Sequence, residues 1–276
     1  ALGFGEQDEA VLRTLTTDVL TSSAIEGEVL DADQVRSSVA RRLGLDIGGL
    51  IAADRHVEGV VEMMLDATRG YDQSLTDDRL FAWHAAMFPT GYSGLSKIRV
   101  GDWRDDAQGP MQVVSGPVHR QKVHYEAPPA NQVDAEMADF LLWFNVDQDD
   151  DPVVKAGLAH LWFVTIHPFE DGNGRIARAV GDMALARAEK SAQRYYSLSA
   201  QIQRERKDYY DRLEATQKGD LDVTDWLEWF LACLLRALQG AEGTLAAVLT
   251  KARFWQHCAG MPRNERQIKL LNKLLD

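Results

Sequence analysis

One segment of this chain is apolar on nearly every face of the helix that it predicts. Residues Val153–Ile166 are mostly hydrophobic and include Leu161, Trp162 and Phe163 in succession. A helix without a polar stripe cannot lie against water, so we expect it at the centre of the fold with other helices around it. Hydrophobic residues make up 45% and charged residues 26% of the 276 residues, which suffices for such a core and excludes a disordered chain.

Apolar side chains recur at helical spacing through most of the remaining sequence. This spacing predicts helices over Glu9–Leu20, Asp33–Leu43, Val57–Thr68, Asp77–Phe88, Gln132–Val146, Ile176–Glu189, Ala200–Gln217, Val223–Leu238, Glu242–Ala259 and Arg263–Leu275. Asp31 is expected to cap the second of these helices and Gly44 to end it. Strand-like alternation is scarce, so the predicted fold class is all-α.

Residues 91–129 depart from the helical pattern and hold four of the eight prolines. Within this stretch Gln112–Ser115 and Lys122–Tyr125 predict two short strands, joined by a turn over Gly116 and Pro117. We therefore expect a small β-hairpin in an α protein. The predicted organisation is an N-terminal helical region (1–50), a core (51–240) and C-terminal helices (241–276).

Composition excludes several classes of protein. The longest apolar candidate, Trp226–Leu238, contains Glu228 and Arg236 and falls short of the roughly 18 residues that a membrane span needs. The two cysteines, Cys233 and Cys258, exclude a disulfide framework and a Cys-based zinc site. A net charge of −12 argues against broad nucleic-acid binding. The start of the chain shows no secretory signal, so the expected location is cytoplasmic.

The most informative segment, His167–Arg178, joins the apolar helix to the next one. Its residues Gly172, Asn173 and Gly174 allow the backbone to turn sharply and to lie close to a ligand. They directly precede a helix, where unpaired N–H groups and the positive end of the helix dipole converge. The segment therefore predicts an anion site of the phosphate-binding kind.

Charged side chains extend that prediction to nucleotide chemistry. Arg175 and Arg178 are three residues apart and share one helix face, which suits a di- or triphosphate. Asp171 offers a hard oxygen ligand for Mg²⁺, and His167 can take up a proton near neutral pH. Each residue alone has an ordinary structural explanation: Asn173 as an N-cap, Arg178 in a surface ion pair, His167 in the core. Their combination in this order predicts nucleotide transfer.

His-Pro-Phe-x-Asp-Gly-Asn-Gly-Arg-x-x-Arg is the signature of Fic domains, and His167–Arg178 matches it at every position. The sequence resembles this family over about residues 15–235. The resemblance implies a Fic-type helical bundle in which Gln112–Tyr125 forms the β-hairpin flap. Ser22–Gly27 fits the family's inhibitory motif, Ser/Thr-x-x-x-Glu-Gly/Asn.

By this resemblance the protein is an adenylyltransferase that moves AMP from ATP onto a Ser, Thr or Tyr hydroxyl of a target protein docked at the flap. The resemblance implies His167 as the general base and Asp171 as the Mg²⁺ ligand. The implied nucleotide-binding residues are Gly172, Asn173, Gly174, Arg175, Arg178, Tyr209, Tyr210, Ser115 and Gly116. A core aromatic pair is an equally good interpretation of Tyr209 and Tyr210.

The resemblance also implies regulation by Glu26 and Ser22. In the family the inhibitory glutamate pairs with the second motif arginine, here Arg178, and takes the space and charge meant for the γ-phosphate. Ser22 is expected to tie Glu26 to the motif loop. Glu26 and Gly27 alone would be an ordinary helix end, but beside the active motif they predict autoinhibition within one chain.

Other functions stay open at this point. The enzyme alternatives are removal of AMP, with Glu26 positioning a water, and transfer of UMP, phosphate or another phosphate-linked group. A non-enzymatic regulator that senses nucleotide and binds DNA or a partner is the alternative of another class. Arg263–Leu275 resembles the first helix of a winged-helix module, so DNA is a partner only if such a module follows residue 276. A homodimer is also left open.

Overall fold

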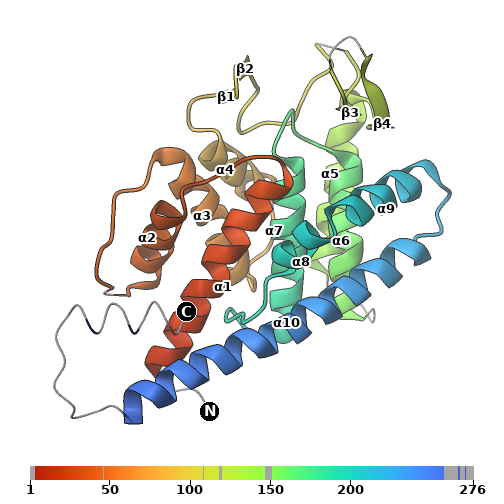
Figure 1. Ribbon diagram of the computed structural model, residues 1–276. Coiled ribbons are helices and arrows are strands. Elements are labelled where there is room, and N and C mark those ends of the chain that lie inside the picture. The colour runs from red at the N-terminus through yellow and green to blue at the C-terminus, as the bar shows by residue number, and fades with distance from the viewer. Residues whose placement is uncertain are drawn as a thin grey trace.

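The computed structural model describes residues 4–257 except 46, 108, 118, 119 and 147–150, and in addition Gln267 and Leu271. It is a helical bundle with two small hairpins at one end (Figure 1). The helices are α1 (Phe4–Ile25), α2 (Ala32–Leu43), α3 (Arg55–Arg69), α4 (Asp77–Met87), α5 (Ala130–Asn145), α6 (Pro152–Ile166), α7 (Asn173–Glu189), α8 (Leu198–Arg204), α9 (Arg206–Lys218) and α10 (Thr224–His257). The strands are β1 (Tyr92–Ser93), β2 (Ser96–Lys97), β3 (Gln112–Ser115) and β4 (Lys122–Glu126).

The centre of the bundle is the packed pair of α6 and α7. Helix α7 is buried at every residue from Arg175 to Ala186, and α1, α3 and α6 pack around it. The apolar segment predicted to be central forms α6, but Leu158 and Trp162 of that helix are partly exposed. The core is therefore centred on the helix that begins inside the motif, and this holds the motif residues on a rigid element.

Helix α1 runs along α2 and α8 and buries Leu12, Leu15 and Val19. It ends next to the motif loop, where Gly27 adopts a left-handed conformation with φ 83° (Figure 1). The predicted boundaries of the following helix are confirmed. Asp31 accepts a hydrogen bond from the Gln34 N–H and caps α2, which ends at a left-handed Gly44.

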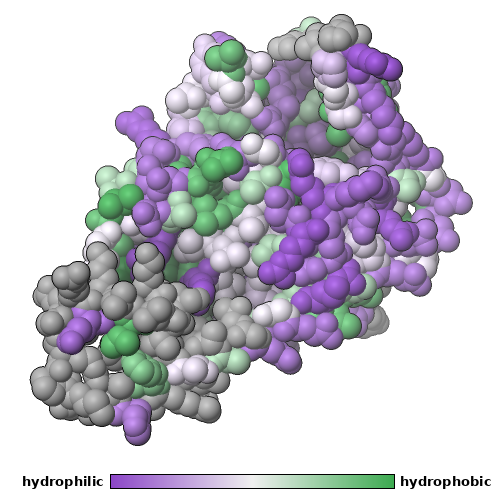
Figure 2. Space-filling view, in the orientation of Figure 1, coloured by the Kyte–Doolittle hydropathy of each residue, from purple (hydrophilic) through white to green (hydrophobic). Residues whose placement is uncertain are grey.

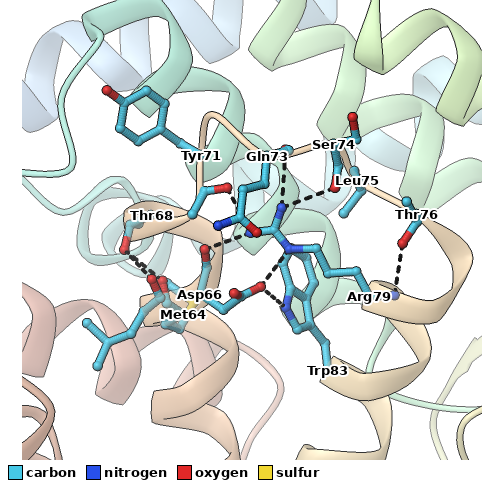
Figure 3. Close-up of polar contacts among 12 residues, drawn as sticks. Met64, Asp66, Thr68, Tyr71, Gln73, Ser74, Leu75, Thr76, Arg79 and Trp83 are labelled. Carbon is cyan, nitrogen blue, oxygen red and sulfur yellow. Dashed lines mark hydrogen bonds and ion pairs between the residues drawn. The ribbon is translucent and has the colours of Figure 1, made fainter.

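A polar cluster fixes the angle between α3 and α4 (Figure 3). Arg79 donates to the Asp66 carboxylate (2.6 Å) and also to the carbonyl oxygens of Gln73 and Ser74. The Trp83 indole N–H donates to the same carboxylate oxygen (2.7 Å). The other end of α4, Met87 and the C-cap residue Phe88, lines one of the cavities described below.

Both hairpins lie at the end of the bundle where α7 begins (Figure 1). The predicted pair forms antiparallel β3–β4, with Gln112 opposite Glu126, Ser115 opposite Lys122 and a bulge after Val113. The second hairpin, β1–β2, was not predicted because each of its strands has only two residues. The predicted flap and the motif loop therefore face one end of the molecule.

Two predicted helix boundaries are wrong. The helix predicted over residues 200–217 is two helices, because Glu205 leaves helical geometry and its carboxylate binds the Arg236 guanidinium through both oxygens (2.6 Å each). The break predicted near Gly240 does not occur, and α10 runs continuously to His257. A glycine inside a helix costs only about 1 kcal/mol, and the neighbouring Ala237 and Ala241 are buried.

One further prediction falls outside the part of the chain that the structure describes. This is the helix predicted over 263–275, of which the structure describes Gln267 and Leu271 alone. Among the described residues, no helix is both long enough and apolar enough to cross a membrane.

Candidate active site

The motif loop owes its shape to two left-handed residues and one buried amide. His167 ends α6 with φ 53°, and Gly172 precedes α7 with φ 82°. The side chain of Asn173, the first residue of α7, accepts from the Phe169 N–H (2.9 Å) and donates to the Phe169 carbonyl (2.8 Å). The side chain of Asn173 is therefore committed to the loop. Any contact of this residue with an anion goes through its main-chain N–H at the start of α7.

One nitrogen of the His167 imidazole is hydrogen-bonded to a backbone carbonyl. Its Nδ1 lies 3.1 Å from the Val164 carbonyl oxygen, which only accepts, so Nδ1 carries the hydrogen and Nε2 keeps a lone pair. Burial lowers the pKa of His167 below its ordinary 6.5, which keeps the ring neutral at pH 7. The Arg104 Nε donates to the His167 carbonyl (2.7 Å) and fixes the backbone at this position. The ring is thus prepared to act as a base.

Two cavities lie at the start of α7, and Glu26 lines both. The His167 cavity, of about 470 Å³, also includes Gly174 and residues of β3, β4 and α9. The Asp171 cavity, of about 390 Å³, also includes Arg175 and residues of the β1–β2 hairpin. In the space-filling view the surface between the two hairpins is hollowed and largely hydrophilic (Figure 2). Glu26 therefore lies between a chamber with a base and a chamber with a carboxylate and an arginine.

Arg178 is buried and bound by the end of α1. Its Nη1 lies 2.7 Å from Glu26 Oε1 in an ion pair, and its Nε donates to the Ser22 hydroxyl (2.9 Å). A further bond runs from Nη2 to the Ser22 carbonyl (2.8 Å). Tyr210 donates to the other Glu26 oxygen (3.3 Å). The predicted contact between Glu26 and Arg178 is present, whereas Ser22 binds Arg178 rather than tying Glu26 to the loop.

Gly174 explains why a carboxylate fits at this position. A Cβ on Gly174 would lie 2.1 Å from Glu26 Oε1. Only a residue without a side chain leaves room for Glu26 against the first turn of α7.

Arg175 is engaged by a different carboxylate. Its Nη1 lies 2.6 Å from Glu28 Oε2, and its guanidinium covers the Phe88 ring at 5.2 Å. Glu28 Oε1 lies 2.6 Å from His56 Nε2, while His56 Nδ1 bonds to the Met87 carbonyl (2.7 Å). Both motif arginines are therefore paired with glutamates from the segment that follows α1.

Asp171 lines its cavity next to Arg175 and is oriented by neighbours. Its Oδ1 accepts from the Gly172 N–H (2.6 Å), and Ser93 donates to Oδ2. The buried His84 ring bonds to the Asp171 carbonyl (3.2 Å). Among the described residues no group of three or more His, Cys, Asp or Glu side chains forms a metal site. A single carboxylate facing a phosphate site still fits Mg²⁺, which takes most of its other ligands from water and phosphates.

The two tyrosines of α9 have different environments. Tyr209 is buried, packs against Trp226, and its hydroxyl lies 3.0 Å from His160 Nε2. Tyr210 is half-buried, and its one hydroxyl hydrogen is shared between the Ile25 carbonyl (3.2 Å) and Glu26 (3.3 Å). Both line the His167 cavity, and the burial of Tyr209 among aromatic side chains agrees with the core interpretation.

The flap is attached to α9 through a chain of side-chain bonds. Ser115 Oγ lies 2.6 Å from His124 Nε2, and His124 Nδ1 lies 2.5 Å from Glu214 Oε2. Lys218 and His124 hold the pKa of Glu214 at about 2, so its carboxylate is ionised and accepts from His124 Nδ1. Ser115 lines the His167 cavity, whereas Gly116 lies at the turn outside the lining, with φ 93°, and the predicted nucleotide contact of both residues stays a prediction.

Sequence reasoning missed several residues that shape the site, chiefly Glu28, His56, His84, Arg104 and Glu214. The contacts that join them to the motif or to the flap span 63 to 147 residues, and His56 lies 28 residues from Glu28. No local pattern signals such pairs.

Residues 74–185 match the Fic/DOC family, and residues 1–45 match a domain of unknown function, DUF4172. The chain is 28% identical over 228 residues to a protein adenylyltransferase Fic of Aedes aegypti, which covers 79% of this chain. It is 35% identical over 207 residues to a protein adenylyltransferase Fic of Nematostella vectensis, which covers 72% of this chain. The chain belongs to the Fic domain family.

Solved Fic structures share the fold. A Fic family protein from Desulfovibrio desulfuricans G20 superposes with a TM-score of 0.61 at 26% identity, over 83% of this chain and 65% of that one. A Fic domain containing signaling protein from Bacteroides thetaiotaomicron VPI-5482 gives a TM-score of 0.65 at 20% identity, over 89% and 92% of the two chains. The Fic chain described here spans 40% of the Aedes relative and 43% of the Nematostella relative.

The Glu28–His56 pair predicts a dependence of stability on pH. The Glu28 carboxylate raises the pKa of His56 above 6.5. Although burial opposes it, the hydrogen bond with His56 and the charge of Arg175 lower the pKa of Glu28 below 4.5. The stabilisation from His56 is complete below pH 6.5 and is lost as pH rises through its raised pKa. That from Glu28 is complete above pH 4.5 and is lost as pH falls through its lowered pKa.

Thermal unfolding of the wild type and of His56→Gln at several pH values measures this effect. We expect the loss of Tm in His56→Gln to be largest at about pH 5.5 and to shrink toward about pH 9. His257→Gln, at the exposed end of α10, is the matched control and should show no such trend. An equal loss of Tm at both pH values would contradict the assignment of a charged His56.

Proposed function

We propose that this Fic protein is an autoinhibited protein adenylyltransferase, which transfers AMP from ATP to a hydroxyl group of a target protein. The observation that carries the proposal is the joint lining of one cavity by His167, Gly174 and Glu26 at the first turn of α7. The names of the adenylyltransferase relatives support the same reaction.

In the proposed reaction the triphosphate lies along the start of α7. His167 Nε2 takes the proton of the acceptor hydroxyl as its oxygen bonds to the α-phosphorus. The bond from the α-phosphorus to the bridging oxygen breaks, and pyrophosphate leaves with that oxygen. Arg175, Arg178 and the main-chain N–H groups of α7 would stabilise the charge on the leaving group. Tyr209, Tyr210 and Ser115 line the remainder of the His167 cavity and would contact the nucleoside.

Mg²⁺, when bound, supplies charge neutralisation at the phosphates, and Asp171 is the residue that we propose holds it. Its carboxylate is oriented by Ser93 and by the Gly172 N–H, and it lines the same cavity as Arg175.

We further propose that the target segment docks along the β3–β4 hairpin, which is the flap. A two-stranded hairpin leaves one edge of each strand unpaired, and such an edge can align an extended peptide by strand addition. Strand addition would bring the acceptor hydroxyl beside Ser115 and the His167 cavity.

Glu26 makes the described conformation an inhibited one in this proposal. Its carboxylate neutralises Arg178 and fills the space over Gly174 that a phosphate would take. Since Arg178 is also held by Ser22, the end of α1 has to shift before the arginine is fully available.

The test is incubation of the protein with ATP labelled on the α- or on the γ-phosphate, with Mg²⁺ and host lysate. We expect protein-bound label only from α-labelled ATP, because AMP retains the α-phosphate and pyrophosphate carries the γ-phosphate away. Label from γ-labelled ATP would instead indicate a phosphotransferase. α-Labelled UTP tests which nucleotide is transferred. Protein-bound label from UTP and none from ATP would contradict the proposal that the transferred group is AMP.

A further inference from the structure

The structure assigns Glu28 as a second inhibitory carboxylate, which blocks Arg175 while Glu26 blocks Arg178. This inference rests on the proposed function and adds to it a residue that determines which nucleotides bind. Glu28 would act against the β- and γ-phosphates specifically, and His56 would position it.

The contact itself is close and largely shielded from solvent. Glu28 Oε2 lies 2.6 Å from Arg175 Nη1, with 6% of the arginine side chain and 34% of the glutamate side chain exposed. Phe88 covers one face of the guanidinium at 5.2 Å. A phosphate can therefore reach this edge of Arg175 only after Glu28 leaves it. A carboxylate and a phosphate compete for the same fork of donors, so bound Glu28 opposes phosphate binding.

The turn after α1 explains how two glutamates reach two arginines. The left-handed Gly27 reverses the chain, and the N–H groups of Gly27 and Glu28 bond back to Ala24 (3.0 Å) and Ser23 (3.1 Å). This turn holds Glu26 and Glu28 against the start of α7. The next residue, Val29, is 93% exposed, so the chain leaves the surface directly after Glu28. The segment between the two helices thus carries both carboxylates and is bound to the motif through them.

His56 is placed to keep Glu28 on Arg175. Its Nδ1 bonds to the Met87 carbonyl, which only accepts, and its Nε2 lies 2.6 Å from Glu28 Oε1. A doubly protonated ring satisfies both neighbours. One glutamate oxygen is thereby held by α3 and the other by α7, which fixes the carboxylate between two cations. His56 is a positioning residue for this contact.

The two glutamates differ in the cavities that they line. Glu26 lines both cavities, whereas Glu28 lines only the Asp171 cavity, away from His167. Removal of the Glu28 charge should therefore strengthen binding of nucleotides with β- and γ-phosphates and leave the monophosphate unaffected. A merely structural role of Glu28 would change the binding of both alike.

Calorimetric titration of the full chain with ATP, ADP and AMP in the presence of Mg²⁺ tests this inference. The variants are Glu28→Gln and, as the matched control, Glu62→Gln, an exposed α3 glutamate that pairs with Arg42. Both are made in a His167→Ala background so that nucleotide is not consumed. We expect Glu28→Gln to tighten ATP binding by roughly tenfold, with AMP binding changed by less than about twofold.

Equal ATP affinity in Glu28→Gln and Glu62→Gln, or equal gains for ATP and AMP, would overturn the inference. His56→Gln is the second variant. It should also tighten the binding of ATP more than that of AMP, but by less than Glu28→Gln does. Incorporation of label from α-labelled ATP, measured with His167 restored, distinguishes the proposed role of Glu28 from the proposed transfer reaction. Labelling together with unchanged ATP affinity rejects only the role of Glu28, and tighter ATP binding without labelling rejects only the transfer reaction.

Discussion

Replacement of His167 by alanine is expected to lower AMP transfer by a factor of about 10²–10⁴, the usual contribution of a general base. The wild-type ring donates through Nδ1 to the Val164 carbonyl and presents Nε2 to the cavity, and alanine leaves no group to take the acceptor proton. The measurement is the rate of label incorporation from α-labelled ATP in a Glu26→Gly background, where transfer is fastest. Because the pKa of His167 is lowered, transfer by the intact protein should fall only as pH drops below about 6.5.

His257→Ala is the matched control, because it removes an exposed histidine at the end of α10 and should leave the rate unchanged. ATP binding by His167→Ala should stay close to that of the parent, since the phosphate ligands are intact. A His167→Ala protein that transfers AMP within a few-fold of its parent would show that another group is the base.

Replacement of Glu26 by glycine is expected to raise the rate of transfer by roughly 10- to 100-fold. The change removes the carboxylate that pairs with Arg178 and fills the space over Gly174. A charge-assisted contact of this kind contributes about 1.5–3 kcal/mol, and each 1.4 kcal/mol corresponds to tenfold in an equilibrium constant. Label incorporation from α-labelled ATP, compared with the wild type at equal protein concentration, measures the gain.

Glu9→Gly is the control for Glu26→Gly, because it places the same substitution at an exposed position of α1. Its rate should equal that of the wild type. If Glu26→Gly incorporates no more label than Glu9→Gly, the inhibitory role of Glu26 is wrong, whatever the outcome for His167.

Much of the fold was predictable because its signals are local. The cap at Asp31, the left-handed Gly44 and the β3–β4 hairpin were all predicted from short patterns. The break at Glu205 within the helix predicted over 200–217 lies where the carboxylate binds Arg236, 31 residues later, a contact that no local pattern signals. The division of the chain at residues 50 and 240 stays a prediction, although α10 continues across the second boundary.

The candidate site, too, has a part that a local pattern predicts and a part that depends on contacts between distant residues. The motif predicted which residues gather at the start of α7, since twelve consecutive residues carry most of them. It could not predict that the Asn173 side chain is committed to Phe169, or that Glu28 and His56 engage Arg175. Those contacts depend on how α1, α3 and α7 pack, and that arrangement comes from the whole core.

The position of Glu26 and Glu28 on a turn of the same chain has a consequence for how the protein would be switched on. A tethered carboxylate competes with ATP at a local concentration on the order of millimolar, whatever the amount of protein in solution. Dilution of the protein therefore leaves Arg175 and Arg178 paired with the two glutamates. In this proposal an activator has to displace the turn after α1 or move α1 itself.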